Sequence, residues 1–145
     1  MITAHNFFSK EDAQKIISSI QKAEASTTAE IRVHIENFCF FNPIKRAEKI
    51  FIYNKMHHTQ DRNAVLFYFA VISRKLAIIG DKGIYEKVEK KVWDEMVHQL
   101  INALKNNTQK AETLCECIEK IGRFLALYFP AKENNPNELS DEISY

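Results

Sequence analysis

The chain has 145 residues, of which 46% are hydrophobic and 27% are charged, and its formal net charge is +1. These values are ordinary for one globular domain that is large enough to bury a core. Residues 131–145 carry one positive and four negative side chains, which leaves +4 for the rest of the chain. That positive excess is too weak to indicate binding to nucleic acid.

The cysteine count and the N-terminal composition bear on the compartment. Three cysteines, an odd number, argue against a disulfide framework and are typical of a reducing environment. Residues 1–10 lack the basic start and the apolar stretch of a signal peptide. The longest apolar run is far shorter than the roughly 20 residues of a membrane helix. We therefore expect a cytoplasmic protein with no membrane segment.

The first predicted elements are a helix and a strand. Ser9 and Asp12 have the spacing of a capping box, and apolar residues continue at helical spacing over residues 13–23. In residues 31–36, apolar and polar residues then alternate. This alternation predicts a strand with one face in water.

A second helix and a hairpin follow. Asn42 and Pro43 combine a capping side chain with a proline at the first helical position. Residues 64–72 are all apolar, are rich in β-branched and aromatic types, and show no helical period, which predicts a strand buried on both faces. Residues 73–75 are polar and lead into a second apolar run, residues 76–79, so we expect an antiparallel hairpin.

The order of elements predicts the fold class. A strand, a helix and a second strand form a right-handed crossover, so the first two strands should be parallel. Two helices follow, one over residues 84–104 with a break near 87–90, and a last one that Pro130 ends. We expect an α/β fold, a three-layer α/β/α sandwich in which helices flank a small mixed β-sheet built from a βαβ crossover and a β-hairpin. Residues 1–130 should form a single domain, and residues 131–145 a polar, disordered tail.

Polar side chains from several segments should meet at one end of this sheet. The start of the first strand, the start of the buried strand and the end of the hairpin all lie there. The side chains gathered at this end are Thr28, Glu30, His57, His58, Asp61, Arg62, Asn63 and Asp81. We assign Asp61, Asp81 and Glu30 as candidate metal ligands, and Arg62, Asn63, Thr28 and His58 as candidate ligand-binding residues.

The residue types indicate which cation would bind. Oxygen ligands suit a hard divalent cation such as Ca²⁺ or Mg²⁺. Imidazole ligands would suit Zn²⁺, which is the less favoured ion because neighbouring histidines on a helix point about 100° apart. The alternative is structural: Asp61 and Asn63 as turn residues, and Asp81 paired with Arg62 at the surface.

Three strings resemble the TPM domain family in order and spacing: TAEIRV at 28–33, RNAVL at 62–66 and LAIIGDKGI at 76–84. The likeness covers roughly residues 7–130 and is to the short, stand-alone bacterial branch of the family. It implies an α/β sandwich and divalent-cation binding at acidic loops. For some members it also implies acid phosphatase activity.

Two functions remain open from the sequence. The first is a divalent-cation-binding accessory or interaction module, whose partner is an unidentified protein or a small phosphorylated ligand. The alternative is a metal-assisted acid phosphatase, in which a bound cation activates water and Arg62 holds the phosphate. Its candidate catalytic residues are Asp61, Arg62 and Asp81.

Overall fold

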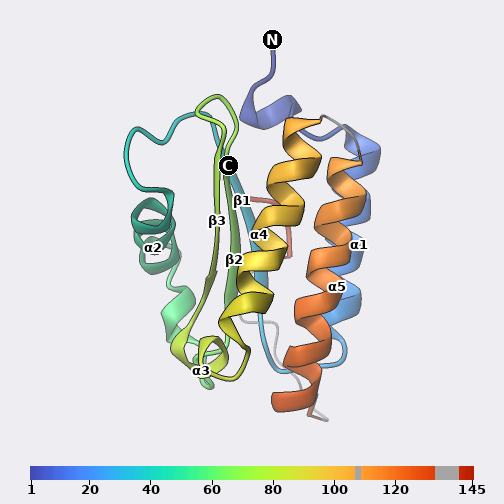
Figure 1. The fold of residues 1–145 in the computed structure, drawn as a ribbon. Coiled ribbons are helices and arrows are strands. Elements are labelled where there is room, and N and C mark those ends of the chain that lie inside the picture. Colours follow the sequence, from blue (N-terminus) through green and yellow to red (C-terminus); the bar gives the residue numbers. More distant parts are fainter. Residues whose placement is uncertain (107–108, 133–140) are drawn as a thin grey trace.

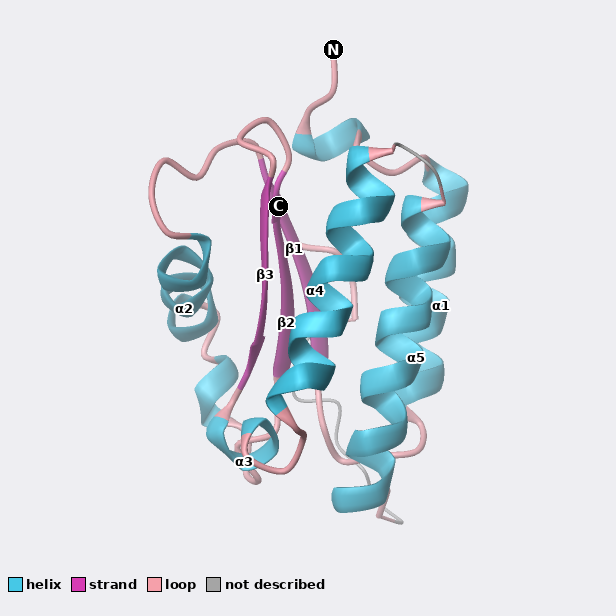
Figure 2. Cartoon of the chain, in the orientation of Figure 1, coloured by secondary structure: helices cyan, strands magenta, loops and turns pink. Residues whose placement is uncertain are grey.

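A computed structural model describes residues 1–106, 109–132 and 141–145 of the chain (Figure 1). Figure 2 marks its helices and strands. In chain order they are η1 (Ala4–Asn6), α1 (Lys10–Glu24), β1 (Ile31–Glu36), α2 (Pro43–Tyr53), η2 (Met56–His58), β2 (Val65–Ala70), β3 (Lys75–Gly80), α3 (Lys82–Tyr85), α4 (Lys90–Lys105) and α5 (Lys110–Tyr128).

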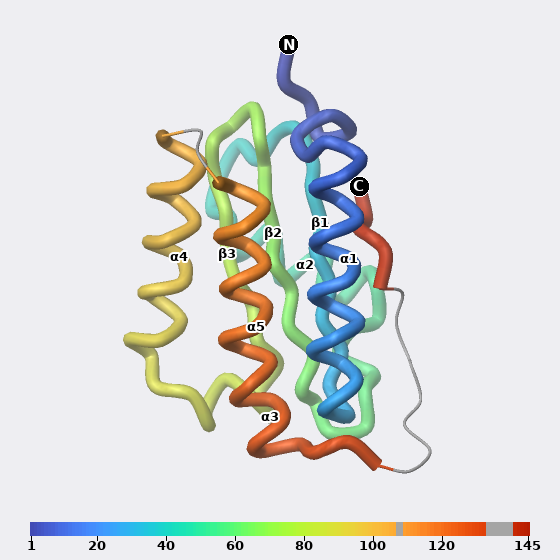
Figure 3. Tube along the Cα trace, turned by 90° about the vertical axis from the view of Figure 1, so that its right-hand side faces the viewer, coloured from blue at the N-terminus to red at the C-terminus, as the bar shows by residue number. Residues whose placement is uncertain are grey.

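The elements form three layers, as the sequence predicts. Helix α2 covers one face of the sheet, and α1, α4 and α5 cover the other (Figure 1). Turned by 90°, the three helices stand in a row with α5 in the middle (Figure 3). None of the described helices combines the length and the apolar character needed to cross a membrane.

The strand order is β1-β2-β3, so β2 is the central strand. β1 runs parallel to β2 with Ile31 opposite Val65 and Glu36 opposite Ala70. β3 runs antiparallel to β2 with Gly80 opposite Val65. The crossover and the hairpin are therefore confirmed, and the starts of β1 and β2 lie beside the end of β3.

The strand β2 is buried on both faces, also as predicted. Val65, Phe67 and Phe69 belong to the core under α1, α4 and α5. Leu66, Tyr68 and Ala70 belong to a second core under α2. The two cores therefore share one strand, and the packing on both of its faces fixes the position of the sheet between the helical layers.

Local signals set most of the helix boundaries. The Ser9 hydroxyl accepts a hydrogen bond from the Asp12 N–H at 3.0 Å, and the Asn42 side chain caps α2. The predicted break in the helix after the hairpin is also present, because α3 ends at Tyr85 and α4 begins at Lys90.

The prediction of a disordered tail is wrong for residues 141–145. The Ser144 N–H donates to the Val33 carbonyl at 2.9 Å, and the Ile35 N–H donates to the Ser144 carbonyl at 2.8 Å. Ile143 joins the core under α1, α4 and α5. The outer edge of β1 offers unpaired backbone groups, and this segment satisfies them. The middle of the expected tail, residues 133–140, lies outside the described residues.

The same segment covers His34. The prediction that this face of β1 lies in water is therefore wrong at His34. His34 as a whole is only 9% exposed, and its Nδ1 lies 2.8 Å from the Ser144 hydroxyl. Burial lowers the pKa of His34. The alternation of residues 31–36 could not show this, because the covering residues come from the far end of the chain.

Replacing Ile143 with alanine should lower the free energy of unfolding by about 2 kcal/mol, because it removes a buried side chain from the core edge. Denaturant titration would measure the change. The matched control is Ile44→Ala, since Ile44 is 52% exposed, and it should change stability by no more than about 0.5 kcal/mol. Equal effects of the two substitutions would contradict the packing of residues 141–145 on β1.

Candidate functional site

The loops before β1 and β2 are joined by side-chain hydrogen bonds at the predicted end of the sheet. The Thr28 hydroxyl donates to Oδ2 of Asp61 at 3.1 Å. The Asn63 amide nitrogen donates to the same hydroxyl at 3.3 Å, and Asn63 is buried. Three of the predicted residues therefore form one small network.

Arg62 and Asp81 form a two-bond ion pair at this end. Nε of Arg62 lies 2.8 Å from Oδ2 of Asp81, and Nη2 lies 3.1 Å from Oδ1. The hydrogen bonds with Asp81 raise the pKa of Arg62. Asp81 also accepts the Lys82 N–H at 2.7 Å, which caps α3. Both oxygens of Asp81 are thus used by donors of the chain itself, in the pairing that the structural alternative anticipates.

Gly83 allows α3 to approach the loop that carries Asp61 and Arg62. Its N–H donates to the Arg62 carbonyl at 2.7 Å. A Cβ atom at this position would lie 2.2 Å from the Asp61 carbonyl oxygen and 2.4 Å from that of Arg62. Only glycine fits this contact, so the contact depends on a residue without a side chain.

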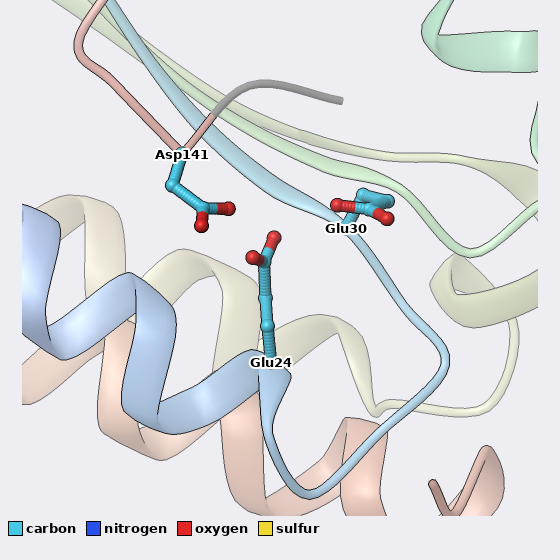
Figure 4. A group of neighbouring side chains, drawn as sticks. All are labelled: Glu24, Glu30 and Asp141. Atoms are coloured by element: carbon cyan, nitrogen blue, oxygen red, sulfur yellow. The ribbon is translucent and has the colours of Figure 1, made fainter. Parts of the chain in front are cut away.

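Glu30 belongs to a different group, a carboxylate cluster with Glu24 and Asp141 (Figure 4). Glu24 ends α1, Glu30 precedes β1, and Asp141 begins the segment that covers the β1 edge. One oxygen of each side chain lies within 4.8 Å of the others. Glu30 is buried, and the other two are half-buried.

The position of Glu24 gives the cluster unusual electrostatics. Burial and a hydrogen bond with Asp141 raise the pKa of Glu24 to about 10, and the nearby charge of Glu30 acts in the same direction. The Ile31 N–H, which donates to Oε2 of Glu24 at 2.8 Å, opposes this rise. In the absence of a cation, these surroundings therefore favour the neutral form of Glu24.

The donor set of the carboxylate cluster fits a hard divalent cation. Calcium binds oxygen ligands at about 2.3–2.6 Å, so two ligands on opposite sides of one ion can be about 5 Å apart. The separation of at most 4.8 Å between the three oxygens is compatible with that geometry. The cluster contains no imidazole or thiolate, the ligands that favour zinc.

His58 stands apart from these contacts. It is exposed on η2, and its ring lies against that of His57 with the centroids 4.1 Å apart. No hydrogen bond or ion pair found among the described residues joins its side chain to Asp61 or Asp81.

Sequence reasoning identified Glu30 but missed its two neighbours. Glu24 looks like an ordinary polar residue at a helix end, and Asp141 lies in the stretch expected to be disordered. No spacing in the sequence connects them, since the cluster forms only when the C-terminal segment pairs with β1.

A third polar group lies on the α2 side of the sheet. Arg46 makes two hydrogen bonds to Glu36, at 2.8 and 2.9 Å, and the Tyr68 hydroxyl donates to the same carboxylate. Burial alone would raise the pKa of Glu36, but the hydrogen bonds from Arg46 and Tyr68 outweigh burial and lower it. These contacts tie α2 to β1 and β2 through an ion pair whose arginine is exposed and whose carboxylate is half-buried, which is a structural role.

Comparisons with known proteins agree with this fold. The family model of the TPM domain matches residues 2–124. The chain is similar to the solution structure of the BA42 protein from the psychrophilic bacterium Bizionia argentinensis, with 36% identity, a TM-score of 0.84, and coverage of 95% of this chain and 94% of that one. The N-terminal domain of the cg2496 protein from Corynebacterium glutamicum shares the fold at 18% identity and a TM-score of 0.61, over 81% of this chain and 74% of that one. Among curated proteins, none matches.

Replacing Gly83 with alanine should destabilise the protein by about 2–3 kcal/mol, because the added methyl group overlaps two carbonyl oxygens. Thermal and denaturant unfolding would measure the loss. Lys82→Ala is the control, since Lys82 is the exposed neighbour on the same short helix, and it should leave stability nearly unchanged. A Gly83→Ala protein of normal stability would show that α3 does not rest on this loop.

In the presence of a chelator, the contribution of Glu24 to the free energy of unfolding should fall as the pH rises between about 4.5 and 10. Below pH 4.5 the carboxyl is protonated in both states, whereas within this window only the folded state keeps the proton. Glu24→Gln should remove that part of the slope. Unfolding curves at several pH values, compared with Glu48→Gln on the exposed side of α2, would test it. Parallel pH profiles for wild type and Glu24→Gln would contradict the raised pKa.

Proposed function

This chain belongs to the TPM domain family, and we propose that it is a divalent-cation-binding accessory or interaction module whose cation lies between Glu24, Glu30 and Asp141. The observation that carries the proposal is the meeting of three carboxylates from three separate segments. Their oxygen atoms are close enough to share one ion, and Ca²⁺ or Mg²⁺ suits such ligands better than Zn²⁺.

Each residue has a definable part in the proposed site. Glu30 is buried and is held at the start of β1, where its carbonyl accepts the Val65 N–H at 2.9 Å. Glu24 is oriented by its hydrogen bond from the Ile31 N–H. Asp141 is the ligand from the C-terminal segment, so a bound cation would attach that segment to the site. A cation at this position would neutralise the crowded negative charge and release the proton held by Glu24.

The consequence for a partner follows from the position of the site. The cation would connect the end of α1, the start of β1 and the segment that covers the β1 edge. Metal binding would then make this edge more rigid, as expected of a surface that is presented to another protein. A partner that is an unidentified protein or a small phosphorylated ligand stays a prediction of the sequence, as does the cytoplasmic location, which the three free cysteines support.

The metal-assisted acid phosphatase stays the alternative. It assigns the substrate phosphate to Arg62, whose Nε and Nη2 are both bonded to Asp81. A phosphate would have to displace that carboxylate, at the cost of breaking a two-bond ion pair. The resemblance to the family supports this alternative, whereas the carboxylate cluster supports cation binding without a catalytic step.

Titration calorimetry with CaCl₂, MgCl₂ and ZnCl₂, on protein first treated with a chelator, should detect one site for a hard cation. Asp141→Asn and Glu30→Gln should each weaken binding by about tenfold or more, because each removes an anionic ligand. Repeating the titration in buffers of different ionisation enthalpy should show proton release, and release should be absent in Glu24→Gln.

Two matched variants distinguish the possible locations of the cation. Asp61→Asn and Asp81→Asn remove carboxylates at the same end of the sheet but outside the cluster, and they should leave the affinity unchanged. Loss of binding in these two variants, with normal binding in Asp141→Asn, would move the cation to the ligands predicted from the sequence. Absence of binding in the wild type would reject the proposal.

A further inference from the structure

The other end of the sheet, at the hairpin turn, contains a cavity of about 930 Å³. The residues that line it come from the turn that joins β2 and β3, the N-terminal segment, the end of α4 and the start of α5. Figure 1 shows these segments at one end of the molecule. Its apolar lining includes Phe7, Phe69, Leu76, Ile101 and Leu104. Pockets of this size and character are typical of sites for small molecules with a large apolar part.

The charged residues that line the cavity are all basic. They are Arg74, Lys75, Lys105 and Lys110, and the described lining includes no aspartate or glutamate. Lys110 lies over the Phe7 ring, with Nζ 4.1 Å from the centroid, and Lys75 donates to the Phe41 carbonyl at 2.7 Å. Arg74 and Lys105 are exposed. None of the ion pairs in the described parts of the chain includes any of the four.

Exposed aromatic residues extend the apolar surface beyond the cavity. Phe38 lines the cavity and is 51% exposed, and its ring stacks on Phe40 with the centroids 5.6 Å apart. The Cys39 N–H donates to the Ser73 hydroxyl at 2.9 Å, which holds this segment against the hairpin turn. An exposed apolar surface of this kind usually marks a binding site.

The combination of an apolar cavity and a basic rim defines the chemistry of the ligand. An apolar chain would leave water on entering the cavity, and an anionic head group would meet the charges of Arg74 and Lys105, neither of which forms an ion pair with another described residue. A neutral amphiphile would lose the attraction to the basic side chains, and an anion without a chain would lose the burial of apolar surface. We propose that the hairpin-end cavity binds a single-chain anionic amphiphile, with its chain against Phe69, Ile101 and Leu104 and its carboxylate or phosphate head beside Arg74 and Lys105.

The test uses dodecyl phosphate as the probe, kept below its critical micelle concentration. Calorimetry should show one bound molecule per chain, and amide NMR shifts should change at the hairpin turn and at the end of α4. Dodecyl maltoside has the same chain and a neutral head group. Its affinity should be lower than that of dodecyl phosphate by about tenfold or more. Inorganic phosphate, which has no chain, should not bind detectably.

Charge reversal tests the role of the rim. The double variant Arg74→Glu, Lys105→Glu should weaken dodecyl phosphate binding by about tenfold or more, which is about 1.4 kcal/mol. The control is Lys49→Glu, Lys82→Glu, which changes two exposed lysines on α2 and α3 by the same charge, and it should bind as the wild type does. All four positions are exposed, so folding should be retained, and amide spectra would verify it.

Several results would overturn the proposal. Equal affinity for dodecyl phosphate and dodecyl maltoside would show an apolar surface without selectivity for anions. Equal affinity for inorganic phosphate would show that the cavity plays no part. Binding to vesicles of phosphatidylglycerol and phosphatidylcholine, without binding of the monomeric probe, would assign the surface to a membrane rather than to a single amphiphile.

Discussion

Strand β2 has almost no contact with water, since each of its residues is at most 1% exposed, and it pairs with β1 on one side and β3 on the other. A strand in this position must place every backbone hydrogen bond within the sheet and every side chain in one of the two cores. The register follows, with Val65 opposite both Ile31 and Gly80. This register brings the loops before β1 and β2 to the end of β3, and every polar contact at that end depends on it.

Two carboxyl groups near this end are stabilised in opposite ways. Asp81 is buried but receives two hydrogen bonds from Arg62 and one from the Lys82 N–H, so its charge is compensated within the chain. Glu24 lies beside two other carboxyl groups, and its raised pKa shows that its neutral form is the favoured one. A cation would change little at Asp81 and much at Glu24. The physical difference between these two sites is the reason that we propose the carboxylate cluster, and not Asp81, as a cation site.

Whether the sequence predicts a contact depends on how far apart along the chain the two residues lie. The strand at residues 64–72 and the polar turn after it were sufficient to predict the hairpin, and the hairpin brings Asp81 to the loop of Arg62. The carboxylate cluster needs residues 141–145 to pair with β1, and no periodicity in that polar stretch indicates a strand. Secondary structure follows from spacing, whereas sites formed between distant segments require the packing itself.

One segment connects the two ends of the molecule. Asp141 lies in the carboxylate cluster, Ser144 pairs with β1, and the Tyr145 ring stacks on His5 in η1 with the centroids 4.6 Å apart. Residues on both sides of η1, Ile2 and Phe7, line the hairpin-end cavity. The strands between the two sites are six residues long, or about 20 Å, so no side chain spans the distance directly. Residues 141–145 form a continuous line of contacts across it, and a cation that restrains Asp141 would restrain the segment whose other end packs beside the cavity.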